Sequence, residues 1–284
     1  MAVFEKNASP YQAFHAVLWD CAYRLGTHTT LLQEGLCDPH RVHQARVALR
    51  RLRTARKTFA PLADDKGWRP LIRTTRKIAS HLGQIRDLDV LSDSLLARLP
   101  KAHAKLLAGA CAQSRSRHCH VLVKVLQDPP GAQLLPSLFE ALRLPLPEPP
   151  PSLSLRAFAD QSLHRLHRQV AKLANRKGGL HHQHALRKRI KELRYAIEFF
   201  SPLYSRKPVQ DYLTHLTGAQ NVLGNLIDHH ASAQQLGLLA SEFPEIAPLR
   251  PALHKRLDED IQAVKARLDP ALKAVRYAPP FWRD

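Results

Sequence analysis

Apolar residues along the chain recur mostly at intervals of three and four, the spacing of one face of an α-helix. Ser9-Pro10 and Asp38-Pro39 each place a capping side chain before a proline, which is typical of a helix start. The pattern predicts helices over residues 10–34, 38–60, 68–99, 101–127, 132–143, 154–177, 181–200, 208–241 and 252–275. No segment shows the period-two alternation of a strand. We therefore expect an all-α protein.

A proline-rich stretch interrupts the helices near the middle of the chain. Five of the seven residues from Pro145 to Pro151 are proline, which excludes helix and favours a stiff, extended connector. We expect a helical bundle over residues 1–144, a linker over 145–153 and a second helical bundle over 154–284.

The two halves repeat one pattern at a constant offset of 141 residues. A single offset without gaps that fits this many positions indicates an internal duplication. The repeated positions are His43, Arg46, Arg50, Arg53, Phe59, Pro61, Leu62, Leu82, Gly83 and Asp87, which correspond to His184, Arg187, Lys191, Arg194, Phe200, Pro202, Leu203, Leu223, Gly224 and Asp228.

The repeated cations fall on one face of each helix. At about 100° per residue, those of the first helix form a stripe about 80° wide, opposite an apolar face. The basic stripe comprises His43, Arg46, Arg50, Arg53 and Lys57 in the first half and His184, Arg187, Lys191 and Arg194 in the second, where the neighbouring Lys188 adds to it. In the third predicted helix Arg69, Arg73, Arg76 and Lys77 share a face, and Ile72, Ile78, Leu82 and Ile85 are expected to turn away from it.

The basic stripe lacks the acidic residues of an ordinary solvated helix. Arg41 to Lys57 holds seven basic residues in seventeen and no acidic one. Like charges one turn apart cost a few tenths of a kcal/mol per pair, so a second anionic surface must offset them. We favour a bound ligand as that surface, and an acidic partner within the protein stays open. Asp87 and Asp228 are expected to orient neighbouring guanidinium or imidazole groups.

The whole chain is strongly basic, with a formal charge of +19 and a pI of about 10.3. This charge indicates a polyanionic partner, which includes nucleic acid, an anionic membrane surface and condensed phosphate. The stripe has no flanking Trp or Phe anchors and no window of 18 apolar residues occurs, so we expect no membrane association. The first residues do not resemble a signal peptide, and four cysteines suit buried thiols, so we expect a cytoplasmic location.

Residues Val42 to Arg53 and Leu82 to Val90 closely resemble the CHAD family, the conserved-histidine α-helical domain. His184 to Tyr195 and Leu223 to Asp228 are similar to the second half of that family. The resemblance spans roughly residues 8 to 275. It implies two pseudo-twofold-related helical bundles around a basic central cleft, and a stand-alone protein that binds inorganic polyphosphate and associates with polyphosphate granules. The binding face would comprise His43, Arg46, Arg50, Arg53, His184, Arg187, Lys191 and Arg194, to which the helical geometry adds Lys57, Arg73, Arg76, Lys77 and Lys188.

The second half departs from the first at cationic positions. Glu198 stands at the place of Lys57, and Thr214, Thr217 and Gly218 stand at the places of Arg73, Arg76 and Lys77. We therefore expect a lopsided site in which the third helix of the second half contributes less charge.

Other functions compete with polyphosphate binding. Nucleic-acid binding is the main alternative, although only 6% of residues are aromatic and few can stack on bases. The chain has no glycine-rich phosphate loop, nucleophile elbow or close carboxylate pair, so we expect no enzymatic activity. A phosphohydrolase or phosphotransferase that uses His43 or His184 is a weaker alternative. We expect no cofactor and no metal, because the histidine clusters lack ligand spacing. The oligomeric state stays open.

Overall fold

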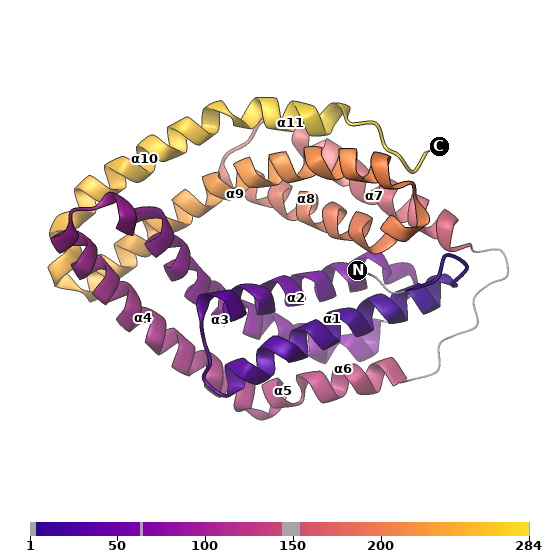
Figure 1. The fold of residues 1–284 in the computed structure, drawn as a ribbon, viewed down its shortest axis with the longest axis horizontal. Coiled ribbons are helices and arrows are strands. Elements are labelled where there is room, and N and C mark those ends of the chain that lie inside the picture. Colours follow the sequence, from indigo (N-terminus) through magenta and orange to yellow (C-terminus); the bar gives the residue numbers. More distant parts are fainter. Residues whose placement is uncertain (1–3, 63–64, 144–153, 284) are drawn as a thin grey trace.

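The computed structural model describes residues 4–62, 65–143 and 154–283, and this part of the chain is helical with no strand. The fold is all-α, as predicted. Figure 1 shows an elongated molecule in which most helices of the first half lie in the lower part and most of those of the second half lie above them. The expected linker over 145–153 lies outside the described residues, as does residue 144.

The first half begins with two helices whose starts are those predicted. The α1 helix (Pro10–Gln33) has a capping box, in which the Ser9 hydroxyl accepts from the Gln12 amide at 3.2 Å and the Gln12 side chain accepts from the Ser9 amide at 2.8 Å. The α2 helix (Pro39–Thr58) starts at Asp38, whose carboxylate accepts from the Arg41 amide at 3.0 Å. The remaining elements of this half are η1 (Ala60–Leu62), α3 (Asp65–Leu95), η2 (Leu96–Arg98), α4 (Lys101–Gln127), α5 (Pro129–Ala132) and α6 (Leu134–Arg143).

The second half follows the same order at its start. Its elements are α7 (Leu155–Ala174), α8 (Leu180–Phe200), η3 (Ser201–Leu203), α9 (Arg206–Glu242), η4 (Pro244–Leu249), α10 (Arg250–Ala266) and α11 (Leu268–Tyr277). The short helices η1 and η3 are offset by 141 residues, as are the first residues of α3 and α9. These boundaries follow the offset of the sequence repeat, and the duplication itself stays a prediction.

The prediction of a single helix over 252–275 is wrong, because two helices, α10 and α11, occupy this segment. The helix is interrupted between α10 and α11 at Arg267. The Arg267 amide donates a hydrogen bond to the Val264 carbonyl three positions earlier, which makes the turn tighter than an α-helical one. Pro270 explains the break, because it has no amide hydrogen to continue the ladder from α10 and its ring clashes with the preceding turn. A proline is tolerated in the first turn of a helix, where Pro270 now lies.

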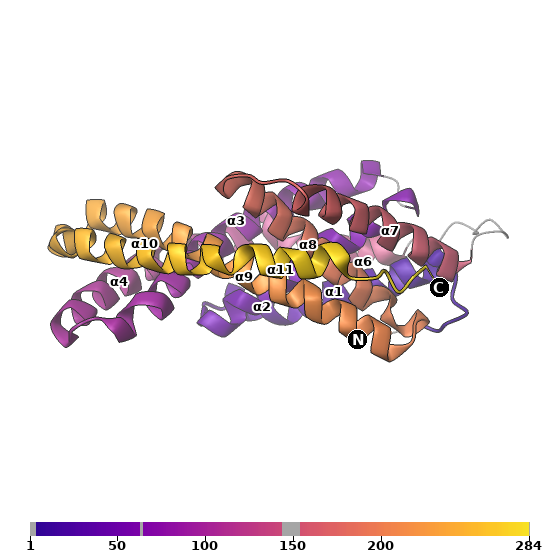
Figure 2. The same cartoon turned by 90° about the horizontal axis from the view of Figure 1, so that it is seen from above.

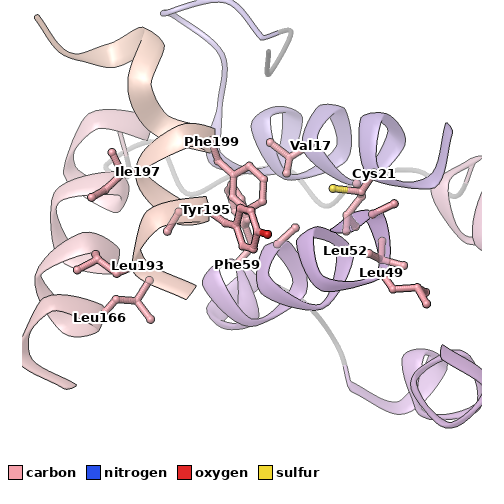
Figure 3. Close-up of a cluster of buried hydrophobic side chains, with 14 of the residues drawn as sticks. Val17, Cys21, Leu49, Leu52, Phe59, Leu166, Leu193, Tyr195, Ile197 and Phe199 are labelled. Atoms are coloured by element: carbon pink, nitrogen blue, oxygen red, sulfur yellow. The ribbon is translucent and has the colours of Figure 1, made fainter. Parts of the chain in front are cut away.

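One hydrophobic core joins the two halves. Its buried side chains come from α1, α2, α7 and α8 among other elements, and Figure 3 shows part of this cluster. Phe59 is fully buried at its centre, with ring centroids 5.1 Å from Phe14, 5.4 Å from Phe158 and 5.3 Å from Phe200. The halves defined by the repeat therefore pack as one unit around these rings.

A second core lies where α3, α4, α9 and α10 meet, and it includes Leu91, Leu107, Leu239 and Leu257. Figure 2 shows α4 and α10 reaching to one end of the molecule, beyond α1, α2, α7 and α8. The long helices α3 and α9 link the two cores, because each contributes buried residues to both. In the described part of the chain, no helix combines the length and apolarity needed to cross a bilayer.

Candidate polyanion-binding site

A cavity of about 610 Å³ lies between α2, α3 and α8. Its lining is dominated by cationic side chains from α2 and α8, with apolar residues of α3 at one side. The basic and histidine side chains that line it are Arg46, Arg50, Arg53, Arg56, Lys57, Arg76, His184, Arg187, Lys188 and Lys191. The remaining lining residues are Leu49, Leu52, Thr54, Ala60, Trp68, Leu71, Ile72, Thr75, Ala79, Leu138 and Glu192.

The two cationic helices are held in place by their apolar faces. On α2, Val42 and Ala45 are fully buried, and on α8 Ile190 and Leu193 are fully buried in the same core. Burying these faces fixes which sector of each helix turns outward, as the helical periodicity of the sequence predicted. The polar sectors of α2 and α8 therefore both contribute to one cavity.

Glycines on the neighbouring helices leave room for two of the guanidinium groups. A Cβ atom at Gly83 of α3 would come within 2.8 Å of Arg46 Nη1, and one at Gly224 of α9 would come within 3.4 Å of Arg187 Nη2. Each glycine is one of the repeated positions, so its place in the pattern has a steric reason: it lets an arginine of the basic stripe lie close against a helix backbone.

Six lining cations make no ion pair or hydrogen bond with any part of the chain that the structure describes. They are Arg46, Arg50, Arg53, Arg76, Lys188 and Lys191. Arg187 differs, because its Nη2 lies 3.5 Å from Asp228 Oδ1, which is the orienting role expected for that aspartate. The described structure shows no ion pair for Asp87, and burial raises the pKa of its carboxyl while Arg46 opposes the rise.

Burial and mutual repulsion act on the charges of these groups. Burial, together with the nearby Arg50 and Arg187, lowers the pKa of Lys191 to about 6. Burial also lowers the pKa of Arg46 and of Arg187. These directions mean that the site holds positive charge at an energetic cost, which a bound anion would offset.

Both predicted histidines have lowered pKa values. His184 lines the cavity, and burial together with Lys188 and Arg187 lowers the pKa of its ring. His43 lies outside the lining; partial burial and the adjacent Arg86 lower its pKa. Both imidazoles are therefore mostly neutral at neutral pH without a ligand.

Two predicted site residues are engaged by carboxylates of α8. The Lys57 ammonium donates to both oxygens of Glu192, at 2.8 Å and 2.7 Å. Arg194 donates to Glu198 at 2.7 Å and to Gln220 at 3.0 Å, and it does not line the cavity. The acidic partner within the protein, which the sequence left open, thus exists for part of the basic stripe.

The contribution of α3 differs from that expected. Arg76 lines the cavity, whereas Arg73 and Lys77 are exposed outside it. The expectation that Ile72 turns away from the basic face is wrong, since Ile72 lines the cavity together with Arg76. The sector of α3 that faces the cavity contains positions 72, 75, 76 and 79, spaced as one helical face, and positions 73 and 77 lie about 100° further round. No described residue of α9 lines the cavity, so the lining is lopsided.

Three charged or aromatic lining residues were not singled out from the sequence. Trp68 places an aromatic ring in the cavity, Arg56 adds a cation, and Glu192 adds a carboxylate. Glu192 follows Arg189 by three positions, a spacing that predicts contact on a helix, and the two side chains form an ion pair at 2.7 Å. Tyr195 is 3% exposed and lies under the guanidinium groups of Arg51 and Arg194. Within the described residues, no three His, Cys, Asp or Glu side chains gather closely enough to share a metal ion.

The family model and one solved structure point to the same family. The family model described as CHAD domain matches residues 16–237. The crystal structure of the CHAD domain from the plant Ricinus communis is similar with a TM-score of 0.86 and 27% identity, covering 99% of this chain and 97% of that one. PptA from Streptomyces chartreusis has a TM-score of 0.70 and 16% identity, covering 94% of this chain and 100% of that one. No curated protein matches the sequence.

The family match spans both basic helices and both repeated leucine–glycine pairs. The fold similarity extends over nearly the whole chain, including the helices that surround the cavity. The chain therefore belongs to the CHAD family.

Proposed function

We propose that this protein binds inorganic polyphosphate in the cavity between α2, α3 and α8, without chemical turnover. The observation that carries the proposal is the set of six basic lining side chains, five arginines and lysines that are charged at neutral pH and Lys191, that have no anionic partner in the described structure. Arg46, Arg50 and Lys191 are partly buried, and Arg53, Arg76 and Lys188 are exposed. Positive charges gathered in one cavity repel one another, and a flexible chain of phosphates relieves that repulsion at every contact. Membership of the CHAD family supports this ligand, because polyphosphate binding is what the resemblance implies.

The chemistry of the lining suits a phosphate chain. Arginine forks can bind two phosphate oxygens at once, and lysines act as point charges that need no fixed orientation. Arg46, Arg50 and Arg53 follow one another along α2, so successive phosphates would meet a cation at each turn of the helix. We place this activity in the cytoplasm, at polyphosphate granules.

We propose binding rather than hydrolysis or phosphoryl transfer. Glu192 is the one carboxylate among the described lining residues, and Lys57 and Arg189 already occupy its oxygens. Hydrolases that use magnesium hold it with carboxylates that are free to coordinate. His184 is the lining residue that a phosphotransferase would use. Incubating the protein with polyphosphate and following the chain length on a gel tests this part, and we expect no shortening.

A second candidate is nucleic-acid binding, which the position of Trp68 favours. An indole ring in a basic cavity can stack on an unpaired base. The deciding experiment is a competition titration of long-chain polyphosphate against duplex DNA and single-stranded RNA at matched charge and two salt concentrations, because any basic protein binds any polyanion at low salt. We expect polyphosphate to win by about a hundredfold near physiological salt, about 2.7 kcal/mol. Equal competition by all three would contradict polyphosphate specificity and leave the net charge as the explanation.

A further inference from the structure

The cavity has two ends of different chemistry. Arg46 lies against Gly83, while α2 leads through η1 directly towards the start of α3, so α2 and α3 run antiparallel along the cavity. Arg53 and Arg76 fall at the same level between the ends, since burial and the nearby Arg76 both lower the pKa of Arg53. Arg46 and Lys57 are eleven positions apart on α2, which is about 16 Å along the helix axis.

One end is cationic. Arg46, Arg187 and Lys191 gather there, and Arg50 lies close enough to lower the pKa of Lys191. Two carboxylates lie near this end: Asp228 pairs with Arg187 at 3.5 Å and also acts on Lys191, and Asp87 acts on Arg46 without a described ion pair. This end suits the most densely charged part of a ligand.

The other end combines apolar side chains with two cations, Arg56 and Lys57, and each of these cations already interacts with another group of the protein. Trp68, Leu71 and Ile72 of α3 line it, together with Ala60 of η1. Its lysine, Lys57, is held in a two-oxygen hydrogen bond by Glu192. A phosphate at this end would have to displace or approach a carboxylate, whereas an uncharged ring would meet an indole and aliphatic side chains.

We infer that the cavity accepts nucleoside polyphosphates, with the base stacked on Trp68 and the phosphates running past Arg53 and Arg76 towards Arg50. The inference rests on the proposed function, because it uses the same cationic wall for the phosphates. It adds a preference that charge alone does not produce: a phosphate chain capped by a base binds more tightly than the bare chain with the same number of phosphates.

The test compares inorganic tetraphosphate with adenosine 5′-tetraphosphate as competitors of a fluorescent long-chain polyphosphate. The nucleotide carries less negative charge than the bare tetraphosphate, so electrostatic attraction alone ranks inorganic tetraphosphate first. The inference predicts the reverse order, with the nucleotide roughly tenfold tighter, which is the scale of one base stacked on an aromatic side chain.

Substitutions locate the base. Trp68→Ala should remove the preference for the nucleotide and leave the affinity for inorganic tetraphosphate within about twofold. Trp68→Phe keeps an aromatic ring and a fuller side chain, so it should fold normally and retain part of the preference. Trp19→Ala is the matched control, because Trp19 is 41% exposed on α1 and does not line this cavity.

The outcomes separate this inference from the proposed function. If both tetraphosphates compete and the nucleotide is no tighter, or if its preference survives Trp68→Ala, the inference is overturned while polyphosphate binding stands. If the labelled polyphosphate itself does not bind, the proposed function fails first. A nucleotide preference that is lost in Trp68→Ala and kept in Trp19→Ala supports the inference.

Discussion

Arg46 and Gly83 fit together so closely that no other residue type can replace the glycine without moving the arginine. The Arg46 guanidinium lies where a Cβ atom at position 83 would approach within 2.8 Å of Nη1. Real Cβ atoms essentially never show so short a contact, and the flexible end of Arg46 is the part that can move. The glycine therefore determines where this charge lies in the cavity.

Gly83→Ala should weaken polyphosphate binding without weakening the fold. Alanine in a helix interior is favoured over glycine by about 1 kcal/mol, so the free energy of unfolding should stay level or rise. Displacing the Arg46 guanidinium should reduce affinity about tenfold, the scale of one lost hydrogen bond to a charged group. Binding titration and thermal unfolding measure the two effects.

Two other glycines calibrate that result. Gly224→Ala should have a smaller effect, because its Cβ would lie 3.4 Å from Arg187 and Asp228 still contacts that guanidinium. Gly109→Ala, in α4, should leave affinity unchanged, since nothing lies within 4 Å of the added atom. Equal affinities for the Gly83 and Gly109 variants would refute the steric role of Gly83.

Replacing Arg50 and Arg53 together by alanine should reduce polyphosphate affinity at least about a hundredfold, about 2.7 kcal/mol. Both side chains line the cavity and neither has an anionic partner in the described structure. Helix content by circular dichroism should be unchanged. The control is the double variant Arg24→Ala with Arg206→Ala, which removes the same charge from exposed positions outside the lining. Matching losses in the two double variants would show that only net charge matters.

Polyphosphate affinity should rise as the pH falls from 8 to 6. In the free protein the pKa of Lys191 is about 6, so this lysine is mostly uncharged above that pH. A bound polyanion raises the pKa, so binding takes up a proton between the free and bound values, and affinity levels off below about pH 6. One proton taken up gives up to about tenfold per pH unit.

Variants separate lysine from histidine in this pH dependence. Lys191→Arg keeps its charge throughout, so its affinity should depend less on pH. The slope that remains belongs to His43 and His184, whose pKa values are also lowered in the free protein. If the affinity of the unchanged protein is constant between pH 5.5 and 8, none of Lys191, His43 and His184 takes up a proton on binding, and the prediction is wrong.

Lys191→Met should stabilise the ligand-free protein while it weakens binding. The ordinary pKa of the lysine is 10.5 and its folded value is about 6, so between these values the unfolded chain binds the proton more readily. Lys191 therefore lowers stability increasingly as the pH falls from 10.5 to 6. At pH 7 we expect a gain of about 1–2 kcal/mol in denaturant unfolding, shrinking towards pH 10. A loss of stability at pH 7 would contradict the cost assigned to this buried charge.

The sequence predicts the fold well because its signals are local. Ser9 and Asp38 mark helix starts, because the side chain of each accepts a hydrogen bond from the amide three positions later. The apolar faces follow helical periodicity. The sequence did not predict the interruption at Arg267. Pro270 is compatible with a kink inside one long helix and with the first turn of a new helix, and only the packing of α10 and α11 decides between the two.

The candidate site is predictable only in its cations. Which of them stay unpaired depends on contacts between distant positions, such as Lys57 with Glu192 and Arg51 with Glu198. No local spacing reports those pairs. Trp68 was likewise missed, because a single aromatic residue at the start of a helix does not reveal which neighbour it faces.

Phe59 and Phe200 end the two basic helices, and their rings meet in the shared core at 5.3 Å. The spacing between the facing rows of charge is therefore set by apolar residues that no ligand touches. A change in ring size at Phe59 would move one row of charges relative to the other and so change the affinity for a bound polyanion, although Phe59 does not line the cavity. Hydrophobic substitutions in the core alone are therefore enough to change the spacing of the binding groups during evolution, while every charged residue is kept.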